Sequence, residues 1–310
     1  MSRLMRRLLK KSICFVGLVG VFAGCASGPA VEQTAAPLQT HGPKKRVAVV
    51  DFVNKSDFGA DRLGKGAADI LTTELVKSNR FIVVERAKLE KLLDEQGLAL
   101  SGVVDEATAA KTGRVLGLNA ILTGAISQFG TKIEGQNLGL YRSKKQTAEC
   151  MVDVRVIDVS TGQILLAESG MGKVDVGSEQ FLGLGSQKGF DETLPGKALR
   201  AAITQLMSGI VGQLESVEWR GKIASIQGDK IYVNAGKETG LQIGDRLRVR
   251  GKGEEIVDPD TGIAIGESLG AEKGVIEVKE HFGADGAIAQ IVSGNGFSRG
   301  DAVQRTENNI

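Results

Sequence analysis

The stretch RFIVVERAKLEKLL, residues 80–93, carries the clearest sign of a mixed α/β fold. Its first part, Phe81–Val84, is apolar and β-branched, which is typical of a short buried strand. Leu89, Leu92 and Leu93 then recur at helical spacing and predict a helix directly after the strand. A strand that leads straight into a helix is a building unit of α/β sheets.

Similar elements lie on both sides of this stretch. Residues 45–53 (KRVAVVDFV) predict a buried strand, and residues 61–78 place apolar side chains on one helical face. Residues 119–126 predict a further strand, and residues 196–217 predict a long amphipathic helix. These elements together predict an α/β domain over residues 44–217.

A β-hairpin is predicted within this domain. Apolar and polar residues alternate over residues 150–156, as expected of a strand with one buried face. Ser160, Thr161 and Gly162 then supply a turn, and residues 163–167 return as a second strand.

The pattern changes after Trp219. Short runs rich in Val and Ile are separated by Gly-Asp turns, such as Gly244-Asp245 and Gly300-Asp301, and by an Asp-Pro-Asp turn. This pattern predicts a small all-β domain over residues 218–305, built as a barrel or a sandwich.

The N-terminus carries an export signal. Residues 1–11 hold five positive charges and no acid, and residues 12–22 form an apolar run too short to span a bilayer. Cys25 follows two small residues, which resembles the lipobox of bacterial lipoproteins. In that motif Cys25 receives a diacylglycerol thioether and becomes the new N-terminus. Residues 1–24 are therefore predicted to be a signal peptide, and residues 25–43 a lipidated cysteine with a flexible tether.

The alternative at Cys25 is ordinary signal cleavage with no lipid attached. Either interpretation places the chain outside the cytoplasm. Cys14 leaves with the signal peptide, and a lipidated Cys25 would be blocked, so Cys150 would have no partner for an internal disulfide.

Composition argues against several classes of function. The first 24 residues hold five of the 39 Lys and Arg residues and none of the 37 Asp and Glu residues, so the remaining chain carries a small negative charge. A basic nucleic-acid surface is therefore not expected, and an aromatic content of 4% argues against base stacking. Two histidines are too few for a histidine-rich zinc site.

Two motifs resemble ligand sites without matching them. Residues 59–66 approach a phosphate-binding loop, but Gly66 stands where the Ser or Thr that ligates magnesium is needed, so we interpret them as a glycine-rich loop leading into a helix. Residues 258–262 (DPDTG) could offer carboxylates to calcium, but Ile263 and Leu269 replace the Gly and Glu of an EF-hand loop. We expect no nucleotide, no metal and no cofactor.

No catalytic constellation is found. Cys150 lies in an alternating strand without a nearby histidine. Glu85 and Arg86 directly follow a strand, where a helix N-terminus and a structural ion pair explain them better than a general acid does. We therefore expect a protein that is not an enzyme.

These motifs together resemble the signature of the CsgG family of curli-secretion lipoproteins. Glu85 and Arg86 match the family's strand–Glu-Arg–helix element, and Ser160, Thr161 and Gly162 match its hairpin turn. Residues 117–124 match a third element, and the resemblance covers about residues 44–216. It implies an outer-membrane lipoprotein that faces the periplasm, assembles with copies of itself, and contacts other envelope or secreted proteins.

The resemblance departs from the family's secretion channel, in which two hairpins per subunit insert into the membrane. The equivalent residues, 128–150 and 168–195, are charged or rich in glycine and look short for membrane strands of roughly 9–11 alternating residues. The loop that narrows the pore has no counterpart either, because residues 53–62 form a short connection. We expect the fold of the family without its pore.

The C-terminal region resembles the C-terminal domain of the flagellar-assembly protein FlgT, through residues 240–247, 258–262 and 299–303. The combined resemblance implies a lipid-anchored factor for assembly or secretion of a curli-like or flagellar surface structure. The alternatives are an oligomeric secretion channel and a lipoprotein regulator of peptidoglycan synthesis. An envelope hydrolase lacks a supporting constellation of catalytic residues.

Overall fold

The computed structural model describes residues 42–59, 61–95, 113–138, 141–181, 184–185, 193–257, 259, 264–268 and 270–306. All of them belong to one compact unit from His41 to Ile310. The predicted signal peptide, Cys25 and most of the tether lie outside the described residues. None of the helices in the described ranges has the length and apolarity needed to cross a bilayer.

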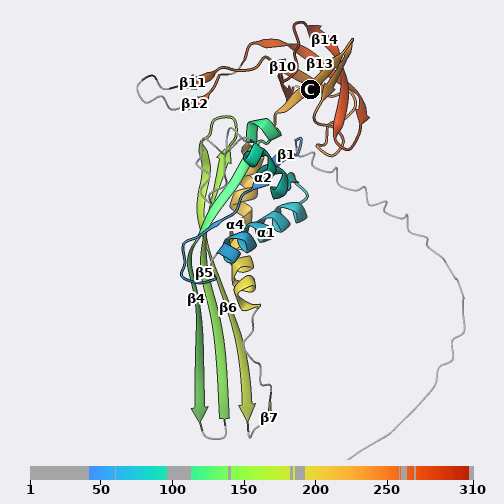
Figure 1. The fold of residues 1–310 in the computed structure, drawn as a ribbon. Coiled ribbons are helices and arrows are strands. Elements are labelled where there is room, and N and C mark those ends of the chain that lie inside the picture. Colours follow the sequence, from blue (N-terminus) through green and yellow to red (C-terminus); the bar gives the residue numbers. More distant parts are fainter. Residues whose placement is uncertain are drawn as a thin grey trace, which may run out of the picture. The chain divides into compact units, whose positions relative to one another are not determined.

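A mixed sheet forms the first part of this unit (Figure 1). Its strand order is β3-β1-β4-β5-β6-β7, and β2 pairs with β4 beside this path. The pairs β1–β3, β1–β4 and β2–β4 are parallel, whereas the pairs β4–β5, β5–β6 and β6–β7 are antiparallel. The bounds of the strands are β1 Lys45–Val49, β2 Val53–Asn54, β3 Phe81–Val84, β4 Ala120–Leu138, β5 Tyr141–Asp158, β6 Ile164–Phe181 and β7 Leu184–Gly185.

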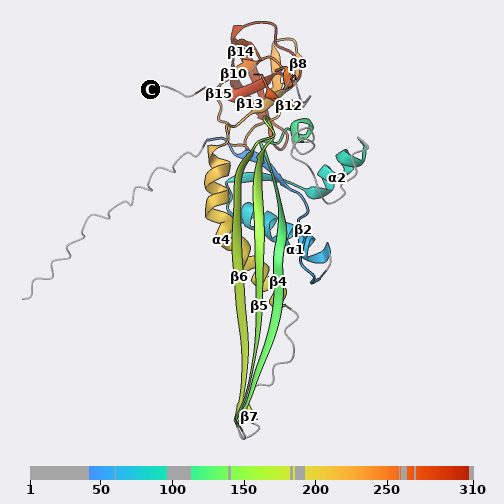
Figure 2. The ribbon, with the colours of Figure 1, turned by 90° about the vertical axis from the view of Figure 1, so that its left-hand side faces the viewer.

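Helices α1 (Asp61–Lys77) and α4 (Leu194–Ser216) pack on the sheet, and α2 (Arg86–Glu95) follows β3. The apolar faces predicted for the two long helices are confirmed, because they form the core with the alternating residues of β5. Figure 2 shows α4 running along β5 and β6. The fully buried members of this core include Leu71, Leu75, Val152, Val154, Val156, Ile203, Ile210 and Leu214.

Two glycines of β6 let α4 lie directly against the backbone of the sheet. A Cβ atom on Gly172 would come within 1.9 Å of the Ala198 carbonyl oxygen, and one on Gly170 within 2.5 Å of the Ala202 carbonyl oxygen. Both helical residues are alanines, whose methyl side chains are too small to hold the two elements apart. The contact is therefore one of backbone against backbone.

The three antiparallel strands are much longer than the sequence predicted. β4 continues to Leu138 instead of ending near Ile126, and it pairs with β5 from Ala120↔Asp158 to Leu138↔Tyr141. β5 and β6 each have 18 residues and span about 60 Å. The expectation that residues 128–150 and the first part of 168–195 are short segments was therefore wrong. The charged residues in these segments interrupt the apolar alternation by which strands are predicted. Backbone hydrogen bonds between the strands and the packing of α4 stabilise them instead.

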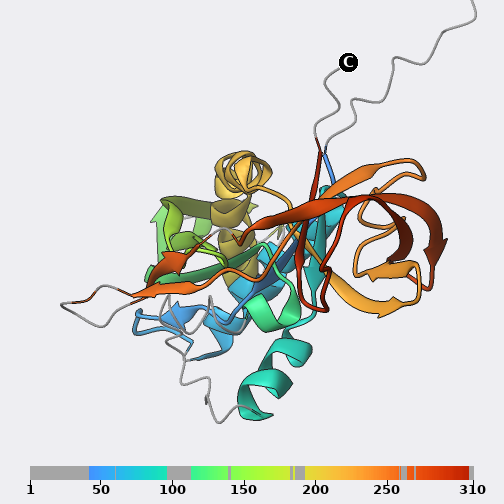
Figure 3. The ribbon, with the colours of Figure 1, turned by 90° about the horizontal axis from the view of Figure 1, so that it is seen from above.

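The second part of the unit is a closed antiparallel barrel with the strand order β10-β13-β14-β9-β8-β15 (Figure 3). The predicted all-β architecture is thus a barrel, and β11 with β12 forms a separate two-stranded sheet. The interior of the barrel is filled by alternating apolar residues such as Leu247, Val249, Ile276, Val278 and Val303. The bounds are β8 Gly221–Gln227, β9 Lys230–Val233, β10 Arg246–Arg250, β11 Glu255–Val257, β12 Ala264–Glu267, β13 Glu272–Phe282, β14 Gly286–Gly294 and β15 Ala302–Arg305.

Two of the Gly-Asp turns use the same arrangement before a barrel strand. Asp245 accepts a hydrogen bond from the backbone N–H of Gln242 at 2.8 Å and pairs with Arg305 at 2.9 Å. Asp301 accepts from the backbone N–H of Ser298 at 2.7 Å and pairs with Lys273 at 2.8 Å. In each case a buried carboxylate closes the turn and binds a cation from another strand of the barrel.

We predict that Gly172→Ala destabilises the protein strongly, whereas Gly177→Ala on the same strand does not. The new methyl at residue 172 collides with α4 backbone, and overpacking of this kind costs about 1–3 kcal/mol. No atom lies within 4 Å of a Cβ at Gly177. Urea unfolding of both variants measures the difference, and equal stabilities would contradict the close contact with α4.

Candidate functional site

Arg86, one of the two signature residues after β3, connects three elements. It begins α2, and its guanidinium donates a hydrogen bond to the carboxylate of Asp51, which follows β1. The same guanidinium lies 3.7 Å from the carboxylate of Asp69 in α1. Glu85 is exposed, and its carbonyl accepts a hydrogen bond from the backbone N–H of Lys88 at 3.1 Å. The arrangement therefore joins β1, α1 and α2 through Arg86.

The turn of the predicted hairpin is organised by Asp158, which the sequence analysis did not single out. One carboxylate oxygen of Asp158 accepts hydrogen bonds from the backbone N–H of Ser160 at 2.6 Å and from its hydroxyl at 2.5 Å. The backbone N–H of Thr161 reaches the same oxygen at 3.1 Å. Gly162 has φ 74°, a conformation that glycine adopts without strain. An Asp two residues before the Ser-Thr-Gly stretch was the available signal.

The face of β4, β5 and β6 that α4 does not cover carries pairs of opposite charges. Lys145 lies 2.9 Å from Asp175 across the two neighbouring strands, and Lys173 pairs with Glu149. Exposed pairs of this kind contribute only about 0–1 kcal/mol each. They do, however, favour one register of the strands, because a slip would place like charges opposite each other. This face suits water or a polar protein surface.

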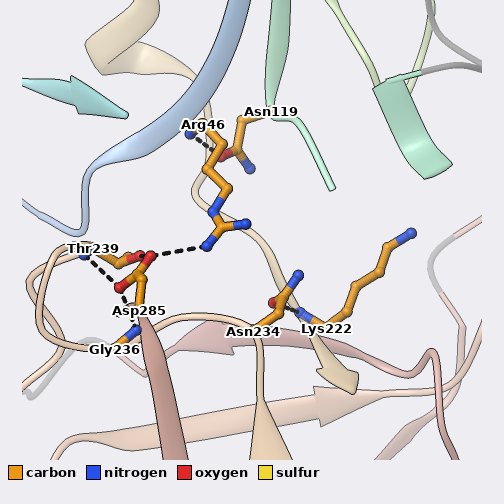
Figure 4. A network of polar contacts seen from close by, with 7 residues as sticks. All are labelled: Arg46, Asn119, Lys222, Asn234, Gly236, Thr239 and Asp285. Atoms are coloured by element: carbon orange, nitrogen blue, oxygen red, sulfur yellow. Dashed lines mark hydrogen bonds and ion pairs between the residues drawn. The ribbon is translucent and has the colours of Figure 1, made fainter. Parts of the chain in front are cut away.

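A second group of polar residues, missed by the sequence analysis, joins the sheet to the barrel (Figure 4). Asp285 lies in the turn between β13 and β14, and its carboxylate accepts hydrogen bonds from the backbone N–H groups of Gly236 at 2.8 Å and Thr239 at 2.9 Å. The Thr239 hydroxyl donates to it at 2.6 Å. The guanidinium of Arg46, in β1, completes the set at 2.9 Å. Four donors thus converge on one carboxylate.

Asn119 and Lys222 extend this joint. The Asn119 side-chain oxygen accepts from the backbone N–H of Arg46 at 2.8 Å, and its amide donates to the carbonyl of Arg220 at 3.1 Å. The ammonium of Lys222 donates to the carbonyl of Arg114 at 2.7 Å. The joint therefore connects the start of β1, which belongs to the sheet, to the barrel.

The hydrogen bonds at the joint also set the ionisation of Asp285. Burial raises the pKa of this carboxyl, but the hydrogen bonds from Thr239, Arg46 and Gly236 together outweigh burial, so the pKa lies below its ordinary value. The backbone at Gly236 must lie close to the turn between β13 and β14 for its N–H to reach the Asp285 carboxylate. A Cβ atom on Gly236 would lie 2.4 Å from the carbonyl oxygen of Gly286.

The structure explains the near match to a phosphate-binding loop by packing. The sequence suggested that Gly64 and Gly66 lie in a loop before the helix. In the structure both residues lie within α1. A Cβ atom on Gly64 would come within 1.9 Å of the Phe52 carbonyl oxygen, so glycine lets the helix contact the chain after β1.

Other predicted features lie beyond the described residues or in the core. Cys25, Asp258 and residues 260–263 are outside the described residues. Cys150 is buried, and burial raises the pKa of its thiol to about 11, which disfavours the reactive thiolate. No group of three or more His, Cys, Asp or Glu side chains that could hold a metal ion is found among the residues that the structure describes.

Comparison with known families identifies the chain. The model of the family described as "Curli production assembly/transport component CsgG" matches residues 31–240, well over half of the sequence. The chain belongs to the CsgG family. The resemblance based on Glu85, Arg86 and the hairpin turn is thereby confirmed.

One curated relative is described as a lipoprotein. "Putative lipoprotein NMB1126/NMB1164" of Neisseria meningitidis serogroup B is 30% identical over 216 residues, which are 66% of this chain and 92% of the relative.

Two solved structures are distant matches. Lipoprotein GNA1162 from Neisseria meningitidis is 17% identical over 55% of this chain and 97% of its own, with a TM-score of 0.34. The C-terminal domain of LpoB from Escherichia coli is 16% identical over 44% of this chain and 86% of its own, with a TM-score of 0.32. Scores this low support no conclusion about function.

We predict that Arg46→Ala lowers the free energy of unfolding by about 1.5–3 kcal/mol, because it removes a hydrogen bond between charged groups at the joint. Arg62→Ala is the control, since Arg62 is an exposed arginine of α1. Chemical denaturation of both variants measures the effect. Equal stability of the two variants would show that the pair with Asp285 contributes nothing.

We also predict a pH dependence for the joint. The folded pKa of Asp285 is depressed, so its stabilising contribution is present above the unfolded value of about 3.9 and is lost as the pH falls through the lower folded pKa. The stability difference between wild type and Asp285→Asn should therefore be constant above about pH 5 and shrink in stronger acid. A difference that grew as the pH fell would contradict this assignment.

Proposed function

We propose that this CsgG-family protein is a lipid-anchored lipoprotein of the outer membrane that faces the periplasm and serves assembly or secretion of a surface structure. It acts through contacts with copies of itself and with other envelope or secreted proteins, and not through catalysis. The observation that carries the proposal is the match of residues 31–240 to the CsgG family immediately after a lipobox-like sequence that ends at Cys25. The curated relative, also described as a lipoprotein, supports it.

The anchor explains how such a protein works without spanning the membrane. A diacylglycerol on Cys25 supplies two acyl chains, which hold a protein on a bilayer far better than one chain does. The tether predicted from the sequence over residues 26–43 would give the folded unit a reach of about 20–25 Å, the span expected of a random coil of that length.

The described surface supports a role in protein contacts. The open face of β4, β5 and β6 carries both signs of charge in alternation, including Lys132, Glu134, Lys145 and Asp175. A protein surface of complementary charge can recognise this pattern in one register, and wrong partners would meet like charges. The length of the strands extends this surface over about 60 Å.

A secretion channel is the second candidate, and the strand lengths favour it. β4, β5 and β6 have 19, 18 and 18 residues, more than the roughly 9–11 needed to cross a bilayer. Their described side chains argue the other way, because charged residues such as Lys132, Glu149 and Lys173 lie on the face that lipid would contact. Planar-bilayer recordings separate the two candidates, since stable conductance steps from the lipidated protein would establish the channel.

We predict that Cys25→Ser abolishes lipid attachment and releases the protein from the membrane fraction. Serine cannot form the thioether, so the variant should incorporate no radiolabelled palmitate. Cys150→Ser is the matched control, because Cys150 is buried in the sheet and should leave labelling unchanged. Full labelling of Cys25→Ser would refute the anchor while leaving the family assignment intact.

A further inference from the structure

The outside of the barrel carries a row of arginines with unused hydrogen-bond donors. Arg246, Arg248 and Arg250 alternate along β10 with the buried Leu247 and Val249, so the three guanidiniums share the outer face. Alternate residues of a strand are about 6.6 Å apart, so the row is about 13 Å long. Within the described part of the chain, none of the three guanidiniums donates a hydrogen bond.

The nearest carboxylates are too distant to occupy these donors. Glu277 lies 3.9 Å from Arg246, and Glu272 lies 3.5 Å from Arg248 and 3.8 Å from Arg250. Charge-assisted hydrogen bonds are shorter, about 2.7–2.9 Å. Both glutamates belong to β13, on one side of β10, so the other side of the row has no negative partner among the described residues.

That other side is formed by β15, whose residues opposite Arg248 and Arg250 are the uncharged Gln304 and Ala302. Gln304 lies opposite Arg248 and is only 8% exposed, yet its amide makes no hydrogen bond to a described residue. The Nε of Arg250 and the hydroxyl of Thr306 are buried and also lack partners within the described chain. Unpaired buried polar atoms are costly. These two lie at opposite ends of the cationic row, because Arg250 pairs with Ala302 and the Thr306 N–H bonds to the Arg246 carbonyl, so they indicate a missing ligand along the row.

We propose that the outer face of β10 and β15 binds an extended, acidic segment of a partner protein with carboxylates at every second residue. An extended chain repeats every two residues with the spacing of the arginines, so successive carboxylates lie opposite Arg246, Arg248 and Arg250. A linear segment along β10 and β15 avoids Glu272 and Glu277. A flat anionic membrane surface would meet both glutamates. This interaction is independent of the lipid anchor and of the surface on β4 to β6.

Binding of a fluorescein-labelled peptide to the full chain tests the proposal. The probe has about 12 residues, with Glu at every second position and Thr between them. Fluorescence anisotropy should show that the double variant Arg248→Gln/Arg250→Gln binds at least about tenfold more weakly than wild type. Lys230→Gln/Lys237→Gln is the charge-matched control on exposed barrel residues and should bind like wild type.

Several outcomes would overturn the proposal. Equal losses for the two double variants would reveal unspecific charge attraction. Equal affinity for an isomeric peptide with its glutamates in one block would reject the two-residue register. Binding to phosphatidylglycerol vesicles that requires Arg248, without binding to the peptide, would assign the face to lipid. Arg248→Gln alone, with its thermal transition measured, keeps the test valid should the loss of the half-buried Arg250 unfold the barrel.

Discussion

The contact of α4 with the backbone of β6 is the constraint on which the long sheet depends. Gly170 and Gly172 bring the strand against Ala198 and Ala202, and this closeness lets the apolar stripe of α4 bury the inner face of β5. The opposite face keeps its charges because it has no cover within the described chain. One helix thus determines which side of three 60 Å strands is core and which is surface.

The connection between the sheet and the barrel at β1 is a second constraint, and it depends on one carboxylate. The Asp285 carboxylate collects four donors, three from the barrel and one from Arg46 of the sheet. β1 also pairs with β3 and β4. Loss of the contact between Arg46 and Asp285 would therefore affect both the sheet and the barrel. The exposed ion pairs of the sheet contribute little by comparison.

The sequence predicted those elements that bury one face. Alternation over residues 150–156 and the helical stripe of α4 were visible because apolar residues must face the core. The distal halves of β4 and β5 were missed, since Lys132, Glu134 and Lys145 give no apolar period to a strand held by backbone hydrogen bonds. The pair of Arg46 and Asp285 was also beyond prediction, because 239 residues separate them and only the fold brings them together.

Family membership, a lipobox-like Cys25 and an extended polar sheet agree with an envelope lipoprotein that acts by assembling with other proteins. The proposed function depends on self-association of the anchored form. Light scattering of the lipidated protein in detergent, with the detergent mass subtracted, measures it most directly. We expect a mass of several chains that persists on dilution, whereas a single-chain mass at high protein concentration would contradict self-association.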